Sequence, residues 1–186
     1  MAQPATFRAT DATPVAWTEA EEAWVAQARE ILIGTAARYR SVITYKALAE
    51  EVQARAGIRT KSLLMNWMGD VLERVAAECH ERQEPQLTAL CVRSDGTVGD
   101  GYAQVTGKTR GEVPEDPDQH AADERLACHR FFGADLPSGG GIAVLTEQVA
   151  ARRRRAAPKP VEREAALCPS CFTQMPLSGG CDPCEN

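Results

Sequence analysis

The spacing of apolar residues changes part-way along this chain, and that change limits the folds open to it. Up to about Arg82, apolar residues recur every three or four positions, which is the period of amphipathic helices. After Pro85, residues 87–93 are rich in strand formers and lead into Ser94-Asp95-Gly96, a typical hairpin turn. Helices followed by a hairpin predict a mainly α, α+β fold. We expect a winged helix-turn-helix-like domain with a short β-hairpin.

Capping signals bound the predicted helices, which cover residues 18–39, 45–56 and 60–82. Thr18 and Glu21 have the spacing of a capping box, and Thr44 is a natural N-cap for the second helix. Gly57 ends that helix, as glycine often does. Further along, we expect a loop over 103–118 and helices over 121–132 and 142–155. In the helix over 121–132, three residues are expected in the core: Leu126, Phe131 and Phe132.

Composition divides the chain of 186 residues into four parts. They are a disordered arm over 1–16, the winged-helix-like domain over 17–135, a helix with a basic and proline-rich linker over 136–162, and a cysteine module over 163–186. The sequence contains neither a signal peptide nor an apolar run long enough to span a membrane. Together with cysteines in metal-like spacing, this favours a cytoplasmic location.

Four of the seven cysteines form two Cys-x-x-Cys pairs near the C-terminus: Cys168 with Cys171, and Cys181 with Cys184. Two intervening residues let both sulfurs of a pair reach one ion, and four thiolates complete a tetrahedral Zn²⁺ site. A pair of redox motifs is the alternative, but no thioredoxin-like pattern surrounds either pair. We therefore expect a structural zinc ribbon or knuckle, which is closed to substrates and can recruit a protein partner.

The formal net charge is −5, so DNA binding would depend on local basic patches. The third predicted helix opens with donors suited to phosphates and base edges: Arg59, Thr60, Lys61, Ser62 and Asn66. Its later residues are acidic, so only its first two turns could enter a groove. Other candidates for phosphate contact are Lys108, Arg110, Arg152, Arg153, Arg154 and Arg155. An ordinary amphipathic helix and a solvated arginine-rich helix end are the alternatives.

Residues 42–49, Val-Ile-Thr-Tyr-Lys-Ala-Leu-Ala, resemble the entry to the DNA-binding domain of the O6-alkylguanine-DNA alkyltransferases and the alkyltransferase-like proteins. Residues 93–96 and the pair Gly101-Tyr102 resemble the segment that follows that family's reactive cysteine. Counting back from Arg93 places Thr88 at the cysteine position, and the family's neighbouring His and Arg are missing as well. The resemblance therefore implies DNA binding without alkyl transfer.

A second resemblance spans roughly residues 17–132. Residues 85–92 followed by Gly99-Asp100-Gly101-Tyr102 are similar to a pattern in poorly characterised bacterial proteins. This similarity supports the order of helices and hairpin, and it implies no particular activity.

We therefore expect a non-enzymatic protein that binds duplex DNA. One alternative is a protein-interaction adaptor, in which the acidic stretch 112–124 would repel DNA. Another is an accessory subunit of a DNA-processing or defence complex, which would combine both roles. Hydrolase and P-loop motifs do not occur, and the three histidines are dispersed along the chain. Trp67 could pack in the core or stack on a base, and core packing is the more common fate of tryptophan.

Overall fold

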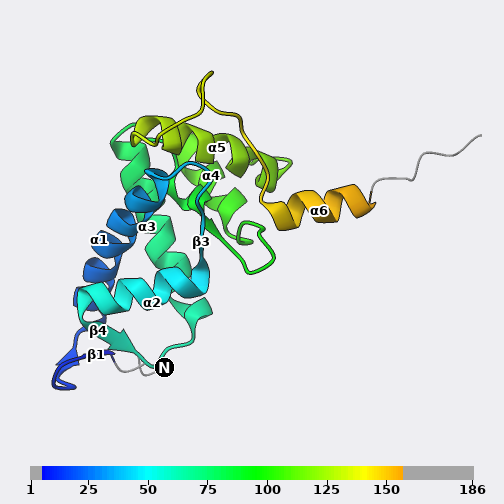
Figure 1. Cartoon of the computed structure of the whole chain (residues 1–186). Coiled ribbons are helices and arrows are strands. Elements are labelled where there is room, and N and C mark those ends of the chain that lie inside the picture. Colours follow the sequence, from blue (N-terminus) through cyan, green and yellow to red (C-terminus); the bar gives the residue numbers. More distant parts are fainter. Residues whose placement is uncertain (1–5, 157–186) are drawn as a thin grey trace, which may run out of the picture. The chain divides into compact units, whose positions relative to one another are not determined.

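The computed structural model describes residues 6–156, and these residues are mainly helical with short strands, an α+β arrangement (Figure 1). The helices are α1 (Trp17–Ala36), α2 (Tyr45–Ala56), α3 (Met68–Glu81), α4 (Tyr102–Arg110), α5 (Pro117–Phe131) and α6 (Glu147–Ala156). The strands are β1 (Thr6–Arg8), β2 (Pro14–Val15), β3 (Ile43–Thr44), β4 (Ile58–Thr60) and β5 (Cys91–Val92). Two 3-10 turns, η1 (Leu64–Asn66) and η2 (Leu87–Leu90), complete the list.

Among the described residues, 6–152 belong to one compact unit, and the boundary to a second unit falls at Arg153. The predicted cysteine module over 163–186 lies outside the described residues. Among the helices that are described, none is both long enough and apolar enough to cross a membrane.

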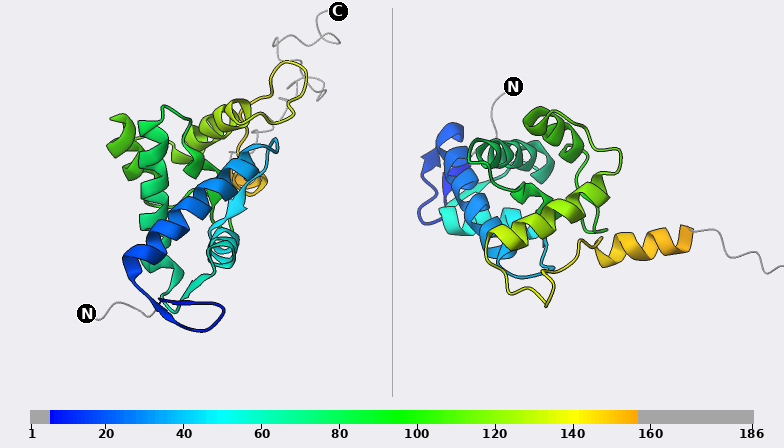
Figure 2. Two further views of the ribbon diagram at one scale, coloured as in Figure 1. Left: turned by 90° about the vertical axis from the view of Figure 1, so that its left-hand side faces the viewer. Right: turned by 90° about the horizontal axis from the view of Figure 1, so that it is seen from above.

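The core is built on α1, which packs against both α2 and α3 (Figure 2). Trp24 of α1 is fully buried, and its ring centroid lies 4.5 Å from that of Trp67. The Trp24 indole Nε1 also donates a hydrogen bond of 3.1 Å to the carbonyl oxygen of Ile58. Trp67 is therefore a core residue, and the alternative in which it stacks on a base is wrong.

The first two helices agree with their predicted apolar faces, although one capping signal does not. Residues Ala20, Trp24 and Ala28 of α1 are all buried, as its spacing predicts. The expected capping box at Thr18 is wrong, because α1 begins at Trp17 and has no side-chain cap. In α2, the Thr44 side chain accepts a hydrogen bond of 3.2 Å from the backbone N–H of Ala47, which confirms the predicted cap.

The third predicted helix begins too early, because α3 starts only at Met68. Residues 58–60 instead form β4, which pairs antiparallel with β1, and β1 pairs with β2. The expectation of a disordered arm over 1–16 is thus wrong for residues 6–8 and 14–15. Strand pairing between distant segments satisfies the backbone hydrogen bonds of both segments. The apolar periodicity within one segment cannot predict such pairing.

The predicted hairpin forms its turn but not its returning strand. The backbone N–H of Arg93 donates to the carbonyl of Thr97 at 2.7 Å, which closes the turn. Beyond it, the Val98 N–H donates to the side chain of Asp118 at 3.0 Å instead of to a strand. The strand before the turn, β5, pairs in parallel with β3, with Ile43 opposite Cys91 and Thr44 opposite Val92. The β-hairpin expected as a wing is therefore absent from the described residues.

Two further expectations are corrected after residue 100. The stretch 103–118, expected as a loop, contains α4 and the start of α5. Phe131, expected in the core, is exposed, while α5 buries small residues and the polar Arg125 and His129. The backbone at Gly111, with φ 85°, ends α4 in the left-handed region that glycine adopts readily. This separates α4 from α5 where composition alone suggested a continuous loop.

Replacing Trp67 with alanine should lower the free energy of unfolding by about 3–5 kcal/mol, because a buried aromatic ring is removed from the centre of the core. Urea denaturation followed by circular dichroism measures this change. Met65→Ala is the matched control, since Met65 is exposed and its loss should change the stability by less than about 0.5 kcal/mol. Equal effects of the two substitutions would contradict this packing.

Candidate functional site

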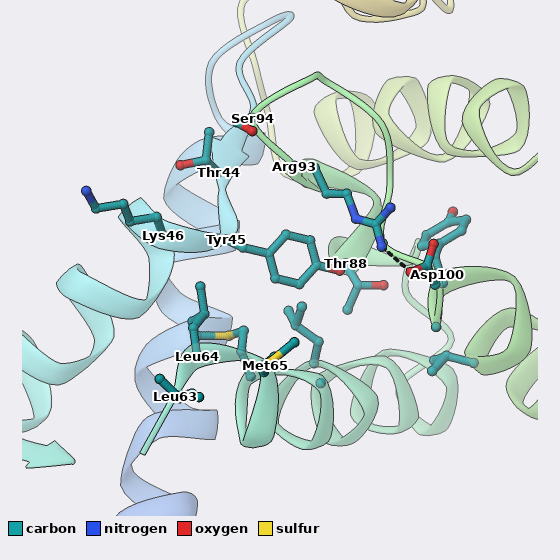
Figure 3. A pocket seen from close by; sticks show the side chains of 17 residues that line it. Thr44, Tyr45, Lys46, Leu63, Leu64, Met65, Thr88, Arg93, Ser94 and Asp100 are labelled. Carbon is teal, nitrogen blue, oxygen red and sulfur yellow. Dashed lines mark ion pairs between the residues drawn. The ribbon is translucent and has the colours of Figure 1, made fainter. Parts of the chain in front are cut away.

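A cavity of about 880 Å³ opens between the start of α2, the turn η1, the start of α3 and the loop 93–101. Leu63, Leu64 and Met65 form one apolar side, and Met68 and Leu72 extend it along α3. Tyr45 projects into the cavity from the first residue of α2, and Thr88 lies beyond its ring (Figure 3). The walls are thus mainly apolar, with a few polar groups at defined places, which is typical of a ligand site.

Tyr45 is held across the cavity by its neighbours in the loop. A Cβ atom at Gly99 would collide with the Tyr45 hydroxyl, so glycine at this position makes room for the ring. Burial raises the pKa of Tyr45 to about 12, because the ionised form would lose its hydration. Tyr45 therefore stays neutral at physiological pH and presents an aromatic face with a hydroxyl group at its end.

Thr88 occupies the position at which the resemblance places a reactive cysteine, and it is only 6% exposed. The Gln86 amide Nε2 donates hydrogen bonds of 3.0 Å both to the Thr88 hydroxyl and to the Thr106 hydroxyl. Thr106 in turn donates to the Tyr102 carbonyl at 2.9 Å. An amide is not a general base, and in the described part of the chain no histidine or carboxylate hydrogen-bonds to Thr88. The arrangement fixes Thr88 as a polar floor and offers it no activation as a nucleophile.

Charged residues of both signs stand at the mouth of the cavity. Arg93 forms an ion pair with Asp100 across the loop (Figure 3). Lys46, one residue after Tyr45, also lines the cavity, and its side chain is largely exposed, with a long 3.9 Å contact to Glu50. Cations at a cavity mouth suit the phosphate groups of a bound ligand.

The residues predicted to open a recognition helix lie instead on β4 and the turns that follow. Arg59, Lys61 and Asn66 are exposed, and within the described residues neither basic side chain pairs with a carboxylate. The Thr60 hydroxyl accepts a 3.0 Å hydrogen bond from the Ser62 backbone N–H. The Ser62 hydroxyl is buried and has no hydrogen-bond partner among the described residues, so it does not face a phosphate. Arg59 on β4, Lys61 just after it and Asn66 on η1 therefore stay available for phosphate contact, and none of them lies on an α-helix.

The other predicted phosphate contacts already have acidic neighbours. Lys108 pairs with Glu73 at 2.6 Å, and Arg110 pairs with Glu124 at 3.1 Å. Arg152 lies within 4 Å of two carboxylates, those of Asp95 and Asp118, at 3.6 and 3.8 Å. These partners compete with phosphate for the three cations. Arg153, Arg154 and Arg155 are exposed at the end of α6.

The apolar wall of the cavity was missed at the level of sequence, because residues 60–82 were assigned to one helix. A signal was present: Leu63, Leu64 and Met65 are three consecutive apolar residues, and an amphipathic helix cannot bury all three on one face. In the structure Leu63 is 67% exposed and Met65 is 82% exposed. Apolar side chains left so open at a cavity mouth indicate a contact surface.

A second cavity, of about 380 Å³, lies between α5 and residues 142–148. Its polar lining residues Arg125 and His129 make hydrogen bonds that hold the fold together. Arg125 donates to the carbonyls of Ala89 and Val144 at 3.1 and 3.4 Å. His129 uses both ring nitrogens: Nδ1 is 2.7 Å from the Ala36 carbonyl oxygen, and Nε2 accepts from the Arg40 N–H at 3.2 Å. Because a carbonyl can only accept and an amide N–H only donate, His129 is the neutral tautomer protonated at Nδ1. It has no lone pair free for a metal ion or a substrate.

The described residues contain no cluster of three or more histidines, cysteines or acids that could hold a metal ion. Cys79, Cys91 and Cys128 are buried free thiols, and burial raises the pKa of each. The four predicted zinc ligands, Cys168, Cys171, Cys181 and Cys184, lie outside the described residues, so zinc binding stays a prediction.

Comparison with known proteins gives no match to a protein-family model, a curated protein or a solved structure. The geometry of the cavity and of its charged mouth is therefore the main guide to function.

Acidification should destabilise the fold through His129. Burial lowers the pKa of His129, so the folded state binds a proton less tightly than the unfolded chain. The free energy of unfolding should be unaffected above the unfolded pKa of about 6.5 and should fall as the pH drops below it. Urea denaturation at neutral and mildly acidic pH measures the fall, which His129→Gln should reduce. His80→Gln, at an exposed position, is the control; an equal fall in all three proteins would exclude His129 as the cause.

Proposed function

We propose that this chain is a non-enzymatic, structure-selective DNA-binding protein that holds an unstacked base in the cavity beside Tyr45. The observation that carries the proposal is the cavity itself, which combines an aromatic side chain, apolar walls and basic residues at the mouth. A base that leaves the stack needs an aromatic or apolar surface for its face and polar groups for its edge. Its flanking phosphates need cations nearby.

The cavity supplies each of these groups from a different element. Tyr45 offers the aromatic face, and Leu64 and Met65 offer apolar contact. The Thr88 hydroxyl at the floor and the backbone of the loop 99–101 offer hydrogen bonds to a base edge. Extruding a base costs a few kcal/mol and costs least where the base is mismatched, damaged or already single-stranded. Selectivity for DNA structure follows from that difference in cost.

Phosphate contacts would come from Lys46 at the mouth and from Arg59 and Lys61, which precede the cavity wall in sequence. In this proposal the exposed segment 59–66 takes the place of a recognition helix, and the turn 93–97 takes the place of the wing. The domain is then a variant of the winged helix-turn-helix arrangement. The segments that carry the alkyltransferase resemblance border this cavity together with Thr88, which supports binding without chemistry.

An adaptor function is favoured by one separate observation, the exposure of Leu63 and Met65. Exposed methionine and leucine side chains adapt to many apolar partners. In that case a protein segment, and not a base, would fill the cavity.

Replacing Gly69 with leucine should block the cavity without harming the fold. Gly69 lines the cavity in the first turn of α3, and a Cβ there would meet no atom within 4 Å. Loss of a stacked base should weaken binding to a mismatched duplex by about five- to a hundredfold, since stacking contributes ~1–3 kcal/mol per base. Fluorescence anisotropy on matched and mismatched duplexes measures the effect.

Gly34→Leu is the matched control, because Gly34 is an exposed helical glycine of α1 with equally open surroundings and lies away from the cavity. It should leave affinity unchanged. If Gly69→Leu keeps full selectivity for the mismatch, the cavity does not receive a base. If no duplex is bound but an apolar peptide is, the adaptor function replaces the proposal.

We also propose that the C-terminal cysteines bind one structural Zn²⁺ per chain, as their spacing predicts. Metal analysis of purified protein should give one zinc, and Cys171→Ser should abolish it because three thiolates hold the ion weakly. Cys91→Ala removes a buried thiol outside the predicted ligand set and should keep the zinc. A zinc content unaffected by Cys171→Ser would rule out this ligand set.

A further inference from the structure

Arg93 and Asp100 stand at the two ends of the loop at the cavity mouth and pair across it. Arg93 follows β5, and Asp100 lies two residues before α4, so both are attached to regular structure (Figure 3). Both side chains face solvent, with 42% of Arg93 and 89% of Asp100 exposed. The hydrogen bond from Arg93 to Asp100 raises the pKa of the guanidinium, so Arg93 is charged at every relevant pH.

Asp100 differs from the other acidic residues near this loop because it has no part in shaping the backbone. Asp95 accepts hydrogen bonds from the Thr97 N–H at 3.1 Å and from the Thr97 hydroxyl at 2.7 Å. Asp118 accepts from the Val98 N–H at 3.0 Å. Asp100, in contrast, has Arg93 as its one ion-pair partner within the described residues, and no backbone N–H there donates to its side chain. Asp100 can therefore release Arg93 without dismantling the turn.

A carboxylate and a phosphate compete for the same N–H edge of a guanidinium, because both accept two parallel N–H bonds. An exposed ion pair contributes little to stability, so exchange of one anion for the other is inexpensive. A DNA phosphate that approaches the cavity mouth meets Arg93 already bound to Asp100. The incoming strand must displace that carboxylate and then lie close to its negative charge.

We propose that Asp100 is an internal competitor for phosphate, which holds Arg93 at the cavity mouth until a nucleic-acid backbone displaces it. This inference rests on the proposed DNA-binding function and adds to it a competitor that lowers the affinity for every duplex. A duplex without an extruded base pays for displacing Asp100 and gains nothing from the cavity. A duplex that places a base beside Tyr45 bears the same cost and offsets it with contacts in the cavity, so at a given protein concentration only that duplex is bound appreciably.

The test is Asp100→Asn, which keeps the side-chain shape and removes the charge. Affinity for a fully matched duplex should rise about two- to fivefold, in line with the small strength of exposed ion pairs. The gain should vanish when Arg93→Gln is also present, because no guanidinium is then released. Fluorescence anisotropy at one fixed salt concentration measures all four proteins of this cycle.

Asp70→Asn is the matched control for a general loss of negative charge. Asp70 is exposed, directly follows the cavity-lining Gly69, and forms no ion pair within the described residues. It should change affinity much less than Asp100→Asn does. An equal gain from Asp70→Asn, or a gain from Asp100→Asn that persists with Arg93→Gln, would overturn the internal-competitor role.

Titration with inorganic phosphate separates this inference from the proposed function. The nitrogen resonance of the Arg93 side chain, assigned by its loss in Arg93→Gln, should shift as phosphate replaces the carboxylate. The midpoint of that shift should move to about two- to fivefold lower phosphate in Asp100→Asn. If the protein binds no DNA but shows this shift of the midpoint, the proposed DNA-binding function is wrong and the role of Asp100 still holds. An unchanged midpoint refutes the role of Asp100, whatever the DNA result.

Discussion

The packing of Trp24 against two distant points of the chain constrains everything around the cavity. Its indole N–H holds the carbonyl of Ile58, and its ring packs on Trp67. The segment between these two anchors, residues 59–66, must leave the core and return to it over a short distance. That path keeps Arg59 and Lys61 in solvent and brings Leu63–Met65 to the cavity mouth. One buried aromatic contact thus creates both the apolar wall and the exposed cations that the proposed function uses.

Periodicity predicted the parts of the fold that depend on neighbours in sequence. The apolar stripe of α1, the Thr44 cap and the Gly57 stop of α2 are local features, and each is present. The errors arose where distant segments decide the outcome. The backbone at Ile58–Thr60 pairs with Thr6–Arg8, and Cys91 pairs with Ile43, so a predicted helix start became a strand and a predicted hairpin became a parallel pair. The residue propensities within one segment cannot predict which distant strand it will pair with.

The sequence likewise predicted only part of the candidate site. Thr88 and the segments around Tyr45 and Arg93 were singled out by resemblance, and they do line one cavity. The basic residues were chosen by charge alone, which cannot show that Lys108 and Arg110 face Glu73 and Glu124. Acidic partners contributed by other helices are invisible in a linear pattern. Charge along the sequence therefore overstated the basic surface, while the consecutive apolar residues at 63–65 were undervalued.

The two-residue pairing of β3 with β5 has a consequence for how this site can vary. Because Thr44 lies opposite Val92, the next residues along the two parallel strands, Tyr45 and Arg93, emerge at the same level. The aromatic group and the cation of the cavity are thus both placed by strand alignment. Exchanging either side chain would leave this alignment intact, but an insertion or deletion between Thr88 and Val92 would displace the floor of the cavity relative to its mouth and to Tyr45. The spacing of these residues therefore constrains the site in addition to their identity.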